Sequence, residues 1–61
     1  MKKKILVISG GVSNEREISL ETGSQVAQEL KKNGYKIKIC EPNYDLSDII
    51  EKFRPNLIFN A

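Results

Sequence analysis

The stretch that decides the fold is GGVSNEREIS, residues 10–19. It follows an apolar run, Ile5–Ile8, and it precedes a segment in which apolar residues recur at helical spacing. A buried strand, a glycine pair and a helix start together predict a ligand-facing corner at the end of a strand in an α/β sheet. The two glutamates within this stretch are unusual, because a helix start that binds an anion would lack them.

The strand before the corner is expected over residues 4–9. Its four consecutive apolar residues, Ile5–Ile8, indicate a strand that is covered on both faces and is therefore central in its sheet. Gly10 and Gly11 are expected to end the strand, because glycine adopts backbone angles that a side chain forbids.

The segment after the corner predicts a long helix from about residue 15 to residue 33. Ser13 or Asn14 is expected to cap it, and Asn14 with Glu17 fits a loose form of the capping box. Gly34 is expected to provide a left-handed cap at the other end. The residues expected to face the sheet are Ile18, Thr22, Gly23, Val26, Ala27 and Leu30. Those expected to point to water are Arg16, Glu21, Gln25, Gln28, Glu29 and Lys32.

The remaining elements complete a βαβαβ pattern. Residues 35–41 alternate between apolar and charged side chains, which places this strand at an edge of the sheet. Asp45 is expected to cap a short second helix with Asp48, and Arg54-Pro55 is expected to end it. A third strand begins at Leu57. The apolar residues of the short helix are Leu46, Ile49, Ile50 and Phe53.

The predicted fold class is α/β, a three-layer βαβαβ Rossmann-like fragment with a parallel sheet in the order 2-1-3. The first strand is central in this order and the second lies at an edge. The corner after the first strand then lies at a topological switch point, where ligands bind in open α/β sheets.

Composition limits the class of protein. Sixty-one residues form one small domain or a piece of a larger one. The net charge is only +2, so the lysines at residues 2–4 are interpreted as a solubilising strand flank in preference to a nucleic-acid or membrane contact. The first apolar run is too short for a signal peptide or a membrane span, and we expect a cytoplasmic protein. Cys40 has no second cysteine or histidine with which to bind a metal.

Two phosphate-binding motifs were compared with the corner. A G-x-G-x-x-G motif that starts at Gly10 would need glycine where the chain has Val12 and Glu15. Glu41 resembles the ribose-binding acid of dinucleotide sites, but Glu15 would repel the pyrophosphate. A P-loop is excluded, since no Gly-Lys-Ser/Thr is present.

Glu15 has two interpretations that spacing does not separate. In the first, it is a first-turn acid that stabilises its own helix through the helix dipole. In the second, it receives a cation, such as the ammonium group of a substrate, in a partly dry site at the edge of the sheet.

The pattern GGxSxERExS of residues 10–19, continued by Thr22-Gly23, resembles the amino-terminal signature of D-alanine–D-alanine ligases. The resemblance extends across all 61 residues to the closing segment at residues 58–61. Ile18 stands where many members have valine, which is a conservative change. In that family a Leu-His-Gly tripeptide typically follows the closing strand, so we expect a fragment that stops just short of it.

The resemblance implies an ATP-grasp ligase that joins two D-alanines for peptidoglycan biosynthesis, and hence for cell-wall formation and cell shape. It implies that ATP phosphorylates the first D-alanine and that the amine of the second attacks the acyl phosphate. Glu15 would be a catalytic residue that binds the ammonium group of the first D-alanine, and Ile18 would line that subsite. Arg16, Glu17 and Ser19 match the motif and are given only a supporting role at the helix start.

The resemblance also implies how the chain fits a whole ligase. Residues 1–61 would be the amino-terminal part of the N-terminal (pre-ATP-grasp) domain, without the central and C-terminal ATP-grasp domains. ATP and Mg²⁺ or Mn²⁺ would then be bound outside this segment. The expected partners are D-alanine and the rest of the ligase chain, in a homodimer, with no nucleic acid or membrane. We expect the segment to be inactive alone. The alternative is a free-standing α/β binding or interaction module in which Glu15 is structural.

Overall fold

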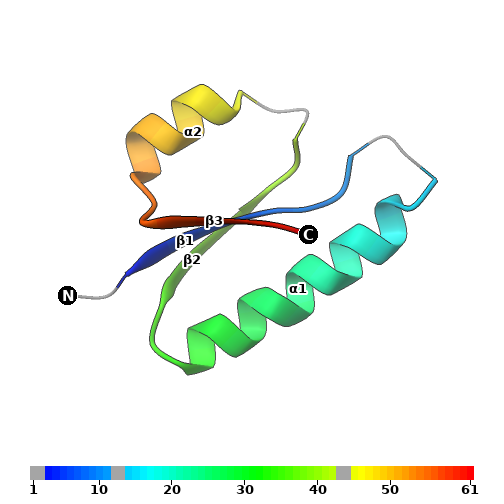
Figure 1. The fold of residues 1–61 in the computed structure, drawn as a ribbon, viewed down its shortest axis with the longest axis horizontal. Coiled ribbons are helices and arrows are strands. Elements are labelled where there is room, and N and C mark those ends of the chain that lie inside the picture. Colours follow the sequence, from blue (N-terminus) through cyan, green and yellow to red (C-terminus); the bar gives the residue numbers. More distant parts are fainter. Residues whose placement is uncertain (1–2, 12–13, 43–44) are drawn as a thin grey trace.

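The computed structural model describes residues 3–11, 14–42 and 45–61. Its elements are β1 (Lys4–Ile8), α1 (Arg16–Lys32), β2 (Lys36–Cys40), α2 (Leu46–Phe53) and β3 (Leu57–Asn60). The strands form one parallel sheet in the order β2-β1-β3. Figure 1 shows α1 on one side of this sheet and α2 on the other. The predicted α/β class, three layers and strand order are confirmed.

The core lies on β1, as its uninterrupted apolar run predicts. Leu6 and Val7 are 0 % exposed, and Ile5 is also buried. In the ladders, Leu6 lies opposite Lys38 of β2 and Ile58 of β3. Because β1 has a strand on each side and a helix over each face, it loses nearly all contact with water.

Helix α1 approaches the sheet most closely at Gly23. A Cβ atom placed there would lie 2.6 Å from the Cβ of Ser9, just past the end of β1. Ala27, one turn further along, is also buried, while Ser9 is 2 % exposed. Among the described residues, the Ser9 hydroxyl is the buried side-chain polar atom that has no hydrogen-bond partner. The small side chains of Gly23 and Ala27 permit this contact, as predicted.

The prediction of which α1 residues face the sheet is wrong for the first turns of the helix. Ile18 is 67 % exposed and Thr22 is also exposed, whereas Val26 and Leu30 are half-buried. Residues four apart on an α-helix drift by about 40° around its axis, because a turn has 3.6 residues. Because α1 lies against the sheet at Gly23, the first two residues of this four-residue spacing, Ile18 and Thr22, turn away from the sheet.

The ends of the helices match the predictions in part. The N-cap of α1 is Glu15, without a side-chain cap hydrogen bond, so the predicted Asn14 cap is wrong; Ser13, the other predicted cap, lies outside the described residues. Gly34 has a φ of +90°, which confirms the left-handed cap. Asp45 caps α2 by accepting a hydrogen bond from the Asp48 amide at 3.3 Å, also as predicted. Helix α2 ends before Arg54.

The outer strands leave apolar side chains at the surface. Among the described strands, β3 pairs with β1 alone, so its other edge is open there. Leu57 is 60 % exposed, and Ile58, Phe59 and Ile39 of β2 are also exposed. Neither helix in the described ranges has the length and apolar character that a membrane crossing requires.

Candidate functional site

The chain leaves β1 through two glycines that have left-handed backbone angles. Gly10 has a φ of +95° and Gly11 a φ of +107°. A Cβ atom at Gly10 would lie 2.5 Å from a carboxylate oxygen of Glu41, and the Gly11 amide donates a hydrogen bond to the same oxygen at 3.4 Å. Glycine is therefore needed at residue 10 for the turn, and it also lets the flexible Glu41 side chain approach closely.

Glu41 also connects the end of β2 to the start of α1. Its Oε1 accepts a hydrogen bond from Nε of Arg16 at 3.1 Å and forms an ion pair with Nη2 at 2.8 Å. The space over the glycines, where a phosphate would lie in a nucleotide site, is thus filled by a carboxylate of the chain itself. Glu41 is paired with Arg16, and among the described residues of the corner its carboxylate would repel a nucleotide phosphate.

The Ser19 hydroxyl joins three parts of the fold. Its Oγ accepts a hydrogen bond from the Gly10 amide at 2.9 Å and donates one to the Ala61 carbonyl at 3.0 Å. The Ser19 amide in turn donates to the Glu15 carbonyl at 3.0 Å, so Glu15 lies one helical turn before it. The glycine corner, the first turns of α1 and the residue after β3 are therefore held together at one side chain.

A hollow of about 260 Å³ opens beside this junction, at the carboxyl end of the sheet. The predicted site residues Glu15 and Ile18 both line it, although Ile18 had also been expected to face the sheet. An aliphatic side chain and a carboxylate thus face one small space. The residues that line the hollow are Gly10, Glu15, Ile18, Ser19, Thr22 and Ala61.

Sequence reasoning missed the tertiary roles of Arg16 and Ser19, which had been assigned only to the helix start. Arg16 contacts a residue 25 positions away, and Ser19 contacts one 42 positions away. The one signal in the sequence is that Ser19 follows Glu15 by four residues, which puts both near one face of the helix. Glu17, the third such residue, is an exposed first-turn acid, as expected.

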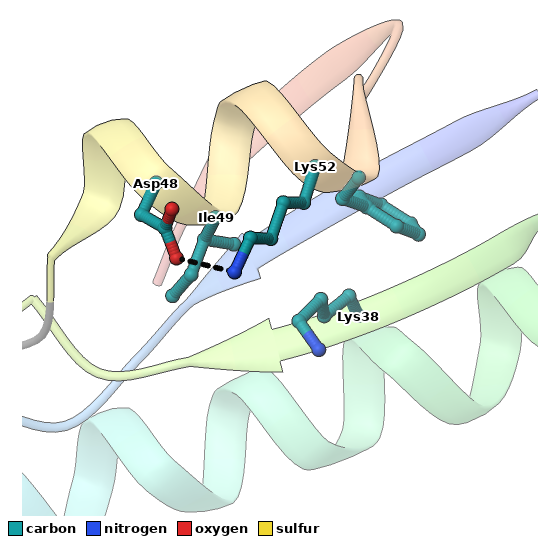
Figure 2. Close-up of a pocket in the computed structure, with 5 residues that line it drawn as sticks. Lys38, Asp48, Ile49 and Lys52 are labelled. Carbon is teal, nitrogen blue, oxygen red and sulfur yellow. Dashed lines mark ion pairs between the residues drawn. The ribbon is translucent and has the colours of Figure 1, made fainter.

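A second, larger hollow of about 380 Å³ lies between α2 and β2. Figure 2 shows that Lys38 of β2 and Lys52 of α2 face it from opposite sides. Lys52 is already paired with Asp48 at 3.2 Å, and its side chain is mostly exposed. This hollow lies away from the glycine corner and contains neither predicted site residue.

Metal and thiol chemistry have little support in the described ranges. Those residues contain no group of three or more histidine, cysteine, aspartate or glutamate side chains placed to hold a metal ion. Cys40 is buried at the end of β2. Burial raises the pKa of its thiol, and the opposing charge of Lys38 is the smaller influence, so the thiol stays protonated at neutral pH.

The Arg16–Glu41 ion pair is expected to contribute modestly to stability. Its side chains are 45 % and 24 % exposed, so water screens their attraction. In a double-mutant cycle of Arg16→Met and Glu41→Gln, we expect a coupling free energy of about 0.5–1 kcal/mol in urea unfolding. The coupling should fall in 1 M salt. A coupling that is absent at low salt would contradict this role.

The sequence that builds this site is similar to known proteins along its whole length. The chain is 62 % identical, over all 61 residues, to a D-alanine–D-alanine ligase of Pelagibacter ubique. Ligases of the same name from Parvibaculum lavamentivorans and Zymomonas mobilis are 42 % and 37 % identical over 97 % and 98 % of the chain. The chain belongs to the D-alanine–D-alanine ligase family. No family model and no solved structure matches it.

The match concerns only the amino-terminal part of these ligases. The chain spans 20 % of the Pelagibacter ligase and 19 % of the other two. The β1–α1 corner, the edge strand β2 and the closing strand β3 all lie within the part matched by the ligases. Their remaining four-fifths lies beyond the region of similarity.

Proposed function

We propose that the hollow beside the glycine corner is part of the site for the first D-alanine of a D-alanine–D-alanine ligase. Glu15 and Ile18, on the first turns of α1, line this single hollow at the carboxyl end of the sheet, and this observation carries the proposal. The hollow lies between the ends of β1 and β3, because Gly10 and Ala61 both line it. Crevices at the carboxyl ends of strands bind ligands in open α/β sheets.

The side chains suit a small amino acid. The Glu15 carboxylate would pair with the substrate's ammonium group, and a hydrogen bond between charged groups is stronger than one between neutral groups. The side chain of Ile18, which is 67 % exposed, would pack against the methyl group of the substrate and so be removed from water. Both residues would bind and orient the first D-alanine, and holding reactants in position lowers the activation barrier of the reaction.

The reaction of the whole ligase is part of the same proposal. ATP supplies the phosphoryl group that activates the carboxylate of the first D-alanine, and the amine of the second then displaces phosphate to form the peptide bond. The carboxylate of Glu41 already fills the glycine corner, so we place ATP and Mg²⁺ or Mn²⁺ outside this segment. We therefore expect the 61-residue chain to be inactive alone. Peptidoglycan synthesis, a cytoplasmic location and a homodimer complete the proposal.

Glu15→Gln, made in the full-length ligase that carries this segment, tests the site. Glutamine keeps the shape of the side chain and removes its charge, so we expect the KM for D-alanine to rise about tenfold or more. The KM for ATP should change by less than about twofold. Initial rates over a range of each substrate give both constants.

Glu21→Gln is the matched control, because Glu21 is an exposed acid elsewhere on α1. It should leave both constants unchanged. If Glu15→Gln behaves like this control, Glu15 does not belong to the D-alanine site and its role is structural.

A further inference from the structure

The Ser19 hydroxyl is the one side chain in the described ranges that hydrogen-bonds to both sides of the glycine-corner hollow. The Gly10 amide that donates to it belongs to the corner after β1, and the Ala61 carbonyl that accepts from it follows β3. The three groups form a chain from N–H to O–H to C=O, with distances of 2.9 and 3.0 Å. Both distances are typical of well-formed hydrogen bonds.

The strand ends at this junction are also tied to each other. The Ala61 amide donates to the Ile8 carbonyl at 2.8 Å, which extends the β1–β3 ladder beyond the last residue of β3. The Ala61 carbonyl then accepts from Ser19. The first turns of α1 are thus held against a firmly paired part of the sheet.

Tertiary bonds hold the start of α1 against the sheet. Glu15 is the N-cap residue, and no side-chain cap hydrogen bond is made there. The Ser19 amide donates to the Glu15 carbonyl, so a shift of Ser19 moves the Glu15 backbone with it. The Arg16–Glu41 pair holds the same turn toward β2, and Ser19 holds it toward β1 and β3.

We propose that Ser19 is a positioning residue: its hydroxyl sets the place of Glu15 relative to the end of β3 and thereby the affinity for the first amino-acid substrate. This inference rests on the proposed function. Small displacements of a binding group lower the rate steeply, because the reacting atoms must be closely aligned. Ser19 acts through Glu15, with no contact to the substrate required.

Three variants of the full-length ligase test the proposal. Ser19→Ala removes both hydrogen bonds, Ser19→Thr keeps a hydroxyl, and Ser24→Ala makes the same chemical change on the exposed face of α1. We expect Ser19→Ala to raise the KM for D-alanine about tenfold, with the KM for ATP within twofold of the parent. Ser19→Thr should recover most of the loss, and Ser24→Ala should show none.

A double variant measures whether the effect of Ser19 on the KM for D-alanine depends on Glu15. If Ser19 acts through Glu15, the double variant Glu15→Gln/Ser19→Ala should have a KM for D-alanine within about twofold of Glu15→Gln alone. A serine that contacts the substrate directly, as its place in the lining of the hollow allows, would instead multiply the two losses and overturn the positioning role. A merely structural serine would lower kcat in proportion to the loss of folded protein and leave the KM unchanged. If Ser19→Ala does not fold, Ser19→Cys keeps the size of the side chain, weakens both bonds and carries the same expectation.

The outcomes separate the two proposals. An unchanged KM in Glu15→Gln overturns the proposed site. A raised KM in Glu15→Gln with an unchanged KM in folded Ser19→Ala or Ser19→Cys overturns only the positioning role of Ser19. A parallel rise of the D-alanine and ATP constants in Ser19→Ala also overturns it.

Discussion

Leu6→Ala is expected to abolish the cooperative unfolding transition of the 61-residue chain. Leu6 is 0 % exposed at the centre of β1, between β2 and β3. Truncation of a buried leucine to alanine costs about 2–5 kcal/mol, because apolar contacts are lost and a cavity is left. A core in a chain this small rarely supplies more than about 3–5 kcal/mol. The loss is therefore comparable with the whole stability.

Circular dichroism during thermal melting measures this effect, with Leu57→Ala as the matched control. Leu57 undergoes the same chemical change but is 60 % exposed on β3, so its truncation should cost less than about 1 kcal/mol. The parent chain should melt at low temperature, since its stability is expected to be marginal. Equal losses in the two variants, or a sharp transition in Leu6→Ala, would contradict this account of the core.

Gly23→Leu is expected to destabilise the chain at the upper end of about 1–3 kcal/mol. A Cβ atom at this position would already lie 2.6 Å from the Ser9 Cβ, and three further carbons have no room. The obstructing atom is close to the backbone of the strand end, so α1 must move away from the sheet. Leucine is nevertheless the better helix former by about 0.8 kcal/mol, so the local and tertiary effects oppose each other.

Two measurements separate these effects. A peptide of residues 14–34 should gain helicity in circular dichroism when Gly23 becomes leucine, while the whole chain should lose stability in urea. Ser24→Leu is the control, because Ser24 lies on the exposed face of the same helix. It should leave the stability within about 0.5 kcal/mol of the parent. A stabilised Gly23→Leu chain would show that α1 does not need its close approach at Ser9.

The corner illustrates how a glycine pair can serve a purpose other than phosphate binding. Gly10 and Gly11 let the chain turn close to Glu41. The carboxylate of Glu41 accepts a hydrogen bond from the Gly11 amide and forms an ion pair with the Arg16 guanidinium. An internal ion pair therefore replaces a bound anion. Glu15, at the N-cap of α1, lines the neighbouring hollow together with Ile18.

Prediction from the sequence worked best where the signal was local or strongly periodic. The apolar run of β1 predicted a central strand, and the alternation around β2 predicted an edge strand. Asp45 was correctly predicted as a cap because its partner, the Asp48 amide, lies three residues away. The Asn14 cap was wrong, since the N-cap residue is Glu15, and the neighbouring Arg16 makes a long-range pair with Glu41.

The sequence by itself determined the α/β class, the parallel order of the strands and the family to which the chain belongs. These follow from apolar spacing, turn residues and a contiguous motif, all of which are properties of neighbouring residues. Only the tertiary structure decided the roles of Ser19, Arg16 and Glu41, and the outward direction of Ile18. The physical reason is distance along the chain: the bond from Ser19 to Ala61 spans 42 residues, and it forms only when packing at Gly23 sets the height and rotation of α1 above the sheet.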